Sequence, residues 1–179
     1  DCGSALAEAE VEYEDHSSPS IYVEFPLDPA SHEELVSRVP EVKGREVSTL
    51  IWTTTPWTIP SNLGVAFHPQ FAYGLYDVEG RPVIVAEELA EQVAAKTGRA
   101  LGAPVARVQG RVFESIKFRH PLYDRTSLGV LADYVTLDTG TGVVHRAPGH
   151  GWDDYLTGVR YGLDIYCPVD DGGGFLPAV

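Results

Sequence analysis

The sequence predicts an α+β fold, in which a compact, closed or nearly closed β-barrel carries helices at its periphery. Short β-branched or apolar segments recur along the whole chain, with Gly, Pro, Asn or Asp between them. A few helical segments are interspersed among them, a mixture typical of α+β domains. The 179 residues contain no internal repeat, linker or low-complexity tract, so we expect a single domain with its own core.

The expected strands are the segments rich in valine, isoleucine, threonine and aromatic residues. The run at 47–55 lacks alternation, as a strand buried on both faces would, whereas 21–25 alternates like a half-buried strand. Glu79 and Gly80 supply a tight turn between two neighbouring strands. The full set covers residues 21–25, 47–55, 63–67, 71–78, 81–85, 105–109, 115–120, 129–136, 142–146 and 164–168.

Helices are expected at residues 31–39, 87–96 and about 152–160. The first opens with a capping-box pattern at Ser31. The second carries an apolar face and stops before Gly98, a residue type common just after helices. The third holds two aspartates in its first turn.

Composition narrows the class of protein. The chain has 26 acidic and 13 basic residues and a net charge of -13. This composition argues against an autonomous nucleic-acid binder, which normally shows a basic patch. No apolar run approaches the ~18 residues that a membrane span needs, and no signal-peptide pattern is present. Cys2 and Cys167 form no disulfide framework, so we expect a reduced, cytoplasmic setting. Because the chain contains no Met, we interpret it as a piece of a larger protein.

Residues 53–62, Thr-Thr-Thr-Pro-Trp-Thr-Ile-Pro-Ser-Asn, form the first of two informative segments. In an extended strand, Thr53 and Thr55 point to one face and Thr54 to the other. Pro56 has no N–H and breaks the ladder, so backbone groups beside it become free for a ligand. Threonine is also simply a good strand residue, but the Trp, Pro and Asn that follow favour ligand binding.

Residues 140–155, Gly-Thr-Gly-Val-Val-His-Arg-Ala-Pro-Gly-His-Gly-Trp-Asp-Asp-Tyr, form the second segment. Gly140 and Gly142 allow the backbone to approach another group closely. Asp153 and Asp154 come where a helix begins, and acidic residues there are stabilised by the helix dipole and cap free N–H groups. We interpret Asp153 in that structural sense. One of the pair can instead turn its carboxylate into a pocket and bind an ammonium group.

The two histidines of this segment leave a metal site open as an alternative. His145 ends a strand and His150 lies in the loop that follows. A single histidine at a strand end is more often structural than a ligand. The pair suggests a metal site, but the pattern is weak because no third ligand converges at a usual spacing. Ser–His–Asp catalysis has no support, since the chain contains no G-x-S-x-G elbow.

Together, the two segments resemble the signature segments of the editing domain (connective polypeptide 1, CP1) of bacterial-type isoleucyl-tRNA synthetases. The resemblance covers essentially the whole chain, including residues 4–13, which are similar to the stretch leading into the inserted domain. Related leucyl and valyl enzymes carry Thr-Thr-Arg-Pro in the first segment, whereas this chain has the isoleucyl form Thr-Thr-Thr-Pro-Trp-Thr. The resemblance implies one editing domain over 1–179, in which 1–19 lead in and 20–179 form the barrel core. The Rossmann-type catalytic domain of such a synthetase is absent here.

The resemblance also implies an activity. The editing domain of this family is a second sieve, with a pocket too small for isoleucine. It hydrolyses the ester of mischarged valyl-tRNA(Ile), and valyl-adenylate, and so acts as an aminoacyl-tRNA deacylase. Such a sieve is needed because a missing methylene is worth only about 1–3 kcal/mol of discrimination, a limit for which isoleucine and valine are the usual illustration.

Site residues follow from the same resemblance. His145 shapes the side-chain pocket and helps to exclude isoleucine. Asp154, rather than Asp153, matches the aspartate that binds the substrate ammonium through a charge-assisted bond. Thr53, Thr55 and Asp154 are expected to serve the catalytic step. The substrate-binding residues are expected to be Trp52, Thr53, Thr54, Thr55, Asn62, His145 and Asp154.

Expected partners are the 3′ terminal adenosine of charged tRNA(Ile), valyl-adenylate and the rest of the synthetase chain, with no membrane. We expect no cofactor and no metal for editing, while ATP and Mg serve the absent synthetic domain. An aminoacyl ester is already activated, so a positioned water suffices, and backbone donors or threonine hydroxyls can stabilise the oxyanion. Two alternatives stay open: a non-catalytic module that binds nucleotides or the tRNA end, and a metal-dependent hydrolase that uses His145 and His150.

Overall fold

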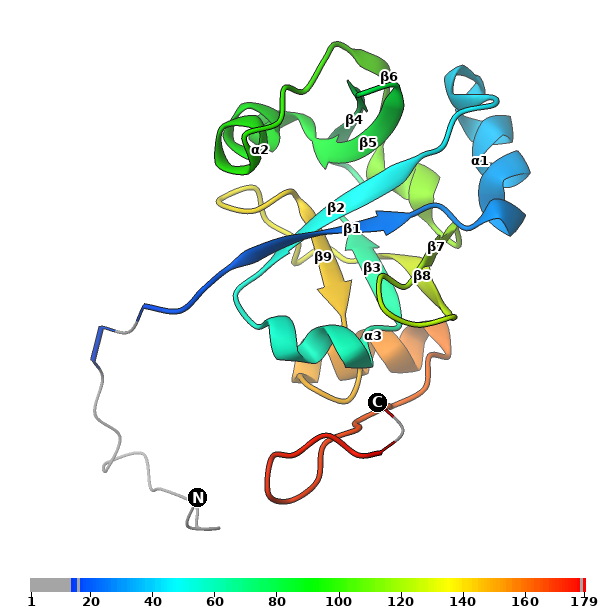
Figure 1. Cartoon of the computed structure of the whole chain (residues 1–179). Coiled ribbons are helices and arrows are strands. Elements are labelled where there is room, and N and C mark those ends of the chain that lie inside the picture. Colours follow the sequence, from blue (N-terminus) through cyan, green and yellow to red (C-terminus); the bar gives the residue numbers. More distant parts are fainter. Residues whose placement is uncertain (1–13, 16, 178) are drawn as a thin grey trace.

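Two mixed β-sheets with helices around them make up the domain (Figure 1). The structure is a computed structural model, and it describes residues 14, 15, 17–177 and 179. The stretch 4–13, which the sequence assigns to the lead-in segment, lies outside the described residues. The α+β class is confirmed.

The first sheet has the strand order β1-β2-β5-β4-β6. Its strands are β1 (Ile21–Pro26), β2 (Ser48–Thr53), β5 (Arg81–Ala86), β4 (Ala72–Val78) and β6 (Pro104–Gln109). β2 and β5 run parallel, and the other neighbours are antiparallel. Glu79 and Gly80 form the predicted tight turn between β4 and β5. Their φ angles of 53° and 87° both lie in the left-handed region, as a two-residue hairpin loop of this twist requires.

The second sheet has the order β7-β8-β3-β9. Its strands are β7 (Lys117–Arg119), β8 (Thr126–Leu131), β3 (Gly64–Phe67) and β9 (Val143–Arg146). β8 and β3 are parallel, whereas β9 pairs antiparallel with β3 and places His145 opposite Val65. β9 is therefore the edge strand that carries the histidine of the second sequence segment.

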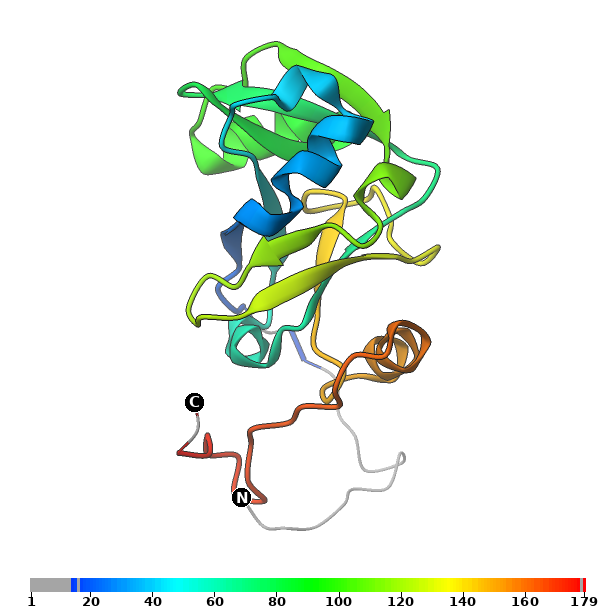
Figure 2. The same ribbon diagram turned by 90° about the vertical axis from the view of Figure 1, so that its right-hand side faces the viewer.

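Helices cover the periphery. The α-helices are α1 (His32–Arg38), α2 (Ala90–Thr97) and α3 (Trp152–Tyr161). Short 3₁₀ helices are η2 (Pro29–Ser31), η3 (Pro40–Val42), η4 (Pro56–Ser61), η5 (Glu87–Leu89) and η6 (Gly110–Phe113). Figures 1 and 2 show α1 and α2 on either side of the first sheet, and α3 beyond the end of β9. No helix in the described part of the chain has both the length and the apolarity to span a membrane.

The expected barrel is not closed. Within the described residues the strands form two hydrogen-bonded sheets, joined by one isolated bridge between Leu27 and Phe118, and β2 approaches β9 without a ladder between them. β2 pairs with β5 at only two positions, Ser48 with Val83 and Thr49 with Ile84. The chain then leaves the first sheet through η4 and enters the second as β3. A closed barrel needs a continuous ring of hydrogen-bonded strands, and the passage of the chain from one sheet to the other through η4 interrupts that ring.

Three local predictions are corrected. The strand expected at 129–136 is shifted to Thr126–Leu131, because the polar Ser127 is buried within it and bonds the side-chain oxygen of Asn62. At 164–168 no strand forms; nearby, Val169 and Phe175 make one isolated bridge. The capping box is not used, since the Ser31 hydroxyl accepts from the Lys117 N–H at 3.0 Å.

One core joins the sheets. Phe67 of β3 contacts the ring of Tyr73 of β4 edge-on, with ring centroids 5.5 Å apart, and both side chains are fully buried. The Tyr73 hydroxyl then donates to the carbonyl of Gly142 at 2.7 Å. This bond ties the loop before β9 to the first sheet and so fixes where β9 begins.

Candidate active site

A cavity of about 410 Å³ lies where the end of β2, η4, β9 and the first turn of α3 meet. The two informative segments of the sequence, far apart in the chain, both line it. The first contributes Trp52, Thr53, Thr54, Thr55 and Thr58, and the second contributes Gly140, Thr141, Gly142, Val143, Val144, His145, Arg146, His150 and Asp154. Tyr134, Thr136 and Thr139 complete the wall.

The threonine run bends sharply at the cavity. β2 ends at Thr53, whose hydroxyl oxygen accepts a hydrogen bond from the N–H of Thr55 at 3.0 Å. The carbonyl of Thr55 accepts both the N–H and the hydroxyl of Thr58, at 3.2 and 2.9 Å. The extended alternation through Thr55 is therefore wrong, and the Thr55 backbone is used inside the turn.

The loop before β9 depends on two glycines. Gly140 and Gly142 have φ angles of +84° and +70°, in the region that favours glycine. A Cβ on Gly140 would lie 3.2 Å from the Trp52 ring, and one on Gly142 would lie 2.4 Å from the Cβ of Ala86. The close approach that the sequence predicts thus occurs against protein groups, and it packs the loop onto the first sheet beside the cavity.

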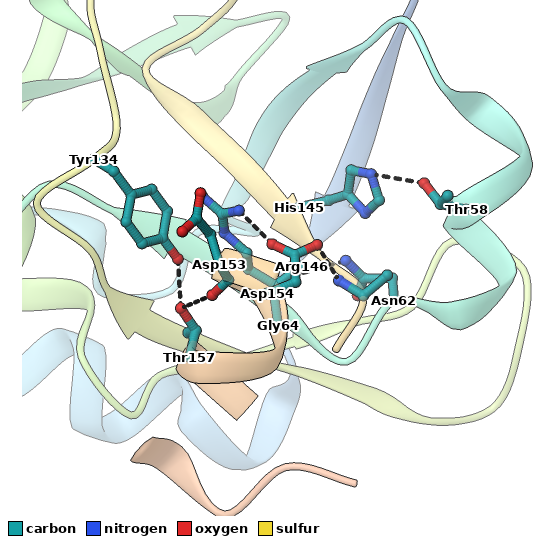
Figure 3. Close-up of polar contacts among 10 residues, drawn as sticks. Thr58, Asn62, Gly64, Tyr134, His145, Arg146, Asp153, Asp154 and Thr157 are labelled. Atoms are coloured by element: carbon teal, nitrogen blue, oxygen red, sulfur yellow. Dashed lines mark hydrogen bonds and ion pairs between the residues drawn. The ribbon is translucent and has the colours of Figure 1, made fainter. Parts of the chain in front are cut away.

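His145 forms a neutral part of the wall. Its side chain is buried, and its Nε2 lies 3.1 Å from the Thr58 hydroxyl (Figure 3). Because that hydroxyl donates its proton to the Thr55 carbonyl, Nε2 is the donor and carries the hydrogen. Burial lowers the pKa of His145 from 6.5 to about 4, against a smaller opposing effect of Asp154. The imidazole is therefore uncharged at neutral pH.

His150 is held separately from His145. Its Nε2 lies 2.8 Å from the Ser61 hydroxyl, and its ring meets Trp57 edge-on at a centroid distance of 5.1 Å. Burial lowers the pKa of His150 as well. Among the described residues, no group of three His, Cys, Asp or Glu side chains is arranged to hold a metal ion. Each histidine instead has a hydroxyl partner in η4.

Asp154 projects from the first turn of α3 toward the end of β9. One carboxylate oxygen pairs with the Arg146 guanidinium, and the other accepts the backbone N–H of Ala147 at 3.1 Å (Figure 3). Asp153, its neighbour, is exposed, and its carbonyl accepts the hydroxyl of Thr157 at 2.8 Å. The two aspartates therefore differ in surroundings, and Asp154 is the one that lines the cavity.

Of the predicted site residues, the structure brings all but one to the cavity. Asn62 is fully buried and does not line it. Its amide donates to the carbonyl of Gly64 at 2.8 Å and accepts from the Ser127 hydroxyl. A role of Asn62 in substrate binding stays a prediction, and the structure gives it the role of joining η4 to the second sheet.

Sequence reasoning missed several wall residues. Thr58 falls within the first segment and could have been found from its hydroxyl, one helical turn beyond Thr55. Arg146 falls within the second segment, but nothing in the pattern distinguishes it from an ordinary strand residue. Tyr134 had no signal, because it lies in a stretch that the sequence assigns to a strand.

The fold is similar to that of solved editing domains of leucyl-tRNA synthetases. The structure of GlLeuRS-CP1 superimposes with a TM-score of 0.64 at 21% identity, over 82% of this chain and 66% of that chain. The editing domain of the P. knowlesi cytosolic leucyl-tRNA synthetase gives 0.66 at 12% identity, over 80% and 62%. At these identities the likeness concerns the fold alone.

By sequence, the particular relatives are isoleucine–tRNA ligases. The chain is 49% identical over 178 residues to that of Desulfovibrio desulfuricans, 53% over 179 to that of Nitratidesulfovibrio vulgaris, and 49% over 170 to that of Geobacillus kaustophilus. These matches cover 99%, 99% and 95% of the chain, but 19%, 19% and 17% of the relatives. No protein-family model matches. The predicted resemblance is confirmed: the chain corresponds to about a fifth of an isoleucyl-tRNA synthetase and has the CP1 editing-domain fold.

Proposed function

We propose that this chain is the part of an isoleucyl-tRNA synthetase that hydrolyses the ester of mischarged valyl-tRNA(Ile), and valyl-adenylate, while excluding isoleucine. One observation carries the proposal: a single cavity is lined by both segments that resemble the signatures of this family, and its wall includes several threonines and the carboxylate residue Asp154. The fold of the editing domains supports it.

Selection by size is assigned to the wall at His145. The ring is buried, bonded to Thr58 and uncharged, so it presents a fixed surface to an aliphatic side chain. Packed groups resist an added methylene, at a cost of about 1–3 kcal/mol. Valine then enters, and the longer isoleucine side chain meets the ring.

Recognition of the substrate ammonium is assigned to Asp154. A carboxylate offers about four lone-pair positions, and two are taken by Arg146 and Ala147. The others remain for the N–H groups of a charged amine, with which a carboxylate makes a strong, charge-assisted bond.

Hydrolysis needs a water, a positioned carbonyl and donors for the oxyanion. The water oxygen bonds to the ester carbonyl carbon, collapse of the tetrahedral oxyanion breaks the bond from that carbon to the ribose oxygen, and a proton of the water passes to the ribose oxygen, so that free valine and the hydroxyl of the terminal adenosine are released. The Thr53 hydroxyl uses a lone pair to accept from Thr55, so its proton is left to donate toward the cavity. We assign oxyanion stabilisation to Thr53 and Thr55, and no cofactor to this step.

Binding of whole tRNA is assigned mainly to the rest of the synthetase. The net charge of -13 opposes the phosphate backbone, so this chain is proposed to hold the 3′ terminal adenosine in the cavity and little else of the RNA. ATP and Mg belong to the synthetic part of such a synthetase, and the proposed location is the cytoplasm, where charged tRNA is used.

The test is deacylation of valyl-tRNA(Ile) by a full-length synthetase that carries this domain, with and without a chelator. Release of valine that the chelator leaves unchanged is the expected result. If the chelator abolishes release, the hydrolysis is metal-dependent. If no valine is released although the charged end binds, the domain is a non-catalytic module.

A further inference from the structure

Arg146 is the buried basic side chain of the cavity wall. It is the last residue of β9, and the side chains of Arg146 and Asp154 are only 9% and 17% exposed. The Arg146 guanidinium pairs with one carboxylate oxygen, and its central carbon lies 4.3 Å from the centroid of the Tyr134 ring. The arginine is thus held by a carboxylate and an aromatic face at once.

Tyr134 is itself braced against α3. Its hydroxyl bonds the hydroxyl of Thr157, and because the Thr157 hydroxyl donates to the Asp153 carbonyl, Tyr134 is the donor (Figure 3). Loop, strand and helix are therefore tied together around one carboxylate. The arginine cannot move without disturbing the first turn of α3.

The Asp154 carboxylate is oriented by two consecutive residues. Arg146 donates from its side chain to one oxygen, and Ala147 donates from its backbone to the other. Two donors on two oxygens prevent the carboxylate from rotating. Its unused lone pairs therefore point in fixed directions.

The position of this carboxylate is linked to the position of His145. His145 and Arg146 are neighbours in β9, and their side chains leave the strand on opposite sides (Figure 3). Pairing with Val65 and Gly64 of β3 fixes the register of both. One peptide unit therefore sets the spacing between the histidine wall and the carboxylate that Arg146 holds.

We propose that Arg146 is a positioning residue that fixes the Asp154 carboxylate at a set spacing from His145, and that it thereby supports discrimination of valine from isoleucine. The inference rests on the proposed function, because it concerns the amine and side chain of the same substrate. A direct contact of Arg146 with an RNA phosphate is the less favoured role. The guanidinium is buried between Asp154 and the Tyr134 ring, its Nη1 donates to Asp154, and its Nε, also buried, has no partner among the described residues.

The experiment uses a full-length synthetase that carries this domain, with three variants. Arg146→Gln removes the charge, and Arg146→Lys keeps it. Arg160→Gln is the matched control. The guanidinium carbon of Arg160 also lies over a tyrosine ring, 5.4 Å from the centroid of Tyr161, but Arg160 is exposed and lies at the opposite end of α3 from Asp154. The kcat and KM for deacylation are measured with valyl-tRNA and isoleucyl-tRNA, and folding is checked by circular dichroism.

We expect Arg146→Gln to lower kcat for valyl-tRNA by roughly tenfold to a hundredfold, the usual effect of a misplaced group, with KM for the charged tRNA nearly unchanged. The preference for valyl- over isoleucyl-tRNA falls with it. Arg146→Lys recovers part of both, and Arg160→Gln matches the wild type.

Wild-type kcat and selectivity in Arg146→Gln would overturn the inference. So would a raised KM at unchanged kcat, which would make Arg146 a contact to the RNA. If the glutamine variant does not fold, the lysine variant decides: lowered kcat at constant KM supports positioning, and a raised KM at unchanged kcat refutes it. Failure of the proposed function is recognised separately, because the wild-type synthetase would then release no valine.

Discussion

Protonation of the buried His145 links pH to the stability of the site. Burial lowers the pKa of His145 to about 4, whereas the unfolded chain has the ordinary value of 6.5. Between these values the unfolded chain binds a proton that the folded chain does not, so stability is present at higher pH and is lost as pH falls. The shift corresponds to about 3 kcal/mol of unfolding free energy, of which about 2 kcal/mol is lost between roughly pH 7 and pH 4.5.

The assay measures the free energy of unfolding of the wild type and of His145→Gln by guanidinium denaturation, at roughly pH 7 and at roughly pH 4.5. The wild type should lose about 2 kcal/mol more than the variant as the pH falls. Other groups, including His120 and His150, whose pKa values burial also lowers, cancel in the difference. An equal loss in both proteins would refute the assignment of His145 as a buried, neutral wall residue.

Three further predictions concern the sieve, the loop and the domain. His145→Ala in the full synthetase should begin to deacylate isoleucyl-tRNA while keeping some activity on valyl-tRNA, a relative change of about tenfold or more; equal loss of both would make His145 catalytic or structural. Gly142→Ala should lower the free energy of unfolding by roughly 2–4 kcal/mol in denaturant melts, because the new Cβ meets Ala86 and the backbone φ is positive. Gly80→Ala is the control, since Gly80 also has a positive φ but has open space around it, and it should cost about 1–2 kcal/mol. Equal losses in the two variants would show that the contact with Ala86 contributes nothing. The isolated chain should bind a non-hydrolysable valyl-adenosine analogue in calorimetric titrations but hold uncharged tRNA weakly, and tight, salt-sensitive tRNA binding would contradict this.

Local patterns in the sequence predict most of the strands. β-branched runs bounded by turn residues mark β3, β4, β5, β6 and β9, and the Glu79–Gly80 turn follows from the same logic. β8 is misplaced because its strand begins with polar residues, and Ser127 is buried only through its partner Asn62. Such a bond between distant residues leaves no local pattern.

Closure of the barrel was not predictable for a related reason. It depends on whether β2 and β9, which lie far apart in the sequence and approach each other in the fold, form a hydrogen-bonded ladder. Pairing between distant strands leaves no local pattern in the sequence.

The sequence predicts which residue types line the candidate site but not the hydrogen bonds and ion pairs between them. Threonines, His145 and Asp154 follow from the two segments and the resemblance they carry. The pairing of Asp154 with Arg146, and the place of Tyr134 beneath the guanidinium, require three elements to meet. Only the folded structure brings these elements together.

α3 places the Asp154 carboxylate in the cavity wall, where we propose that it binds the substrate ammonium. The most direct measurement compares Asp154→Asn with Asp153→Asn, its exposed neighbour, in deacylation of valyl-tRNA(Ile) by the full synthetase. Loss of a hydrogen bond to a charged group should lower the rate about tenfold to a hundredfold for Asp154→Asn, while Asp153→Asn keeps most of the activity. Equal effects, or a larger effect at Asp153, would contradict the assignment of Asp154 as the ligand of the ammonium.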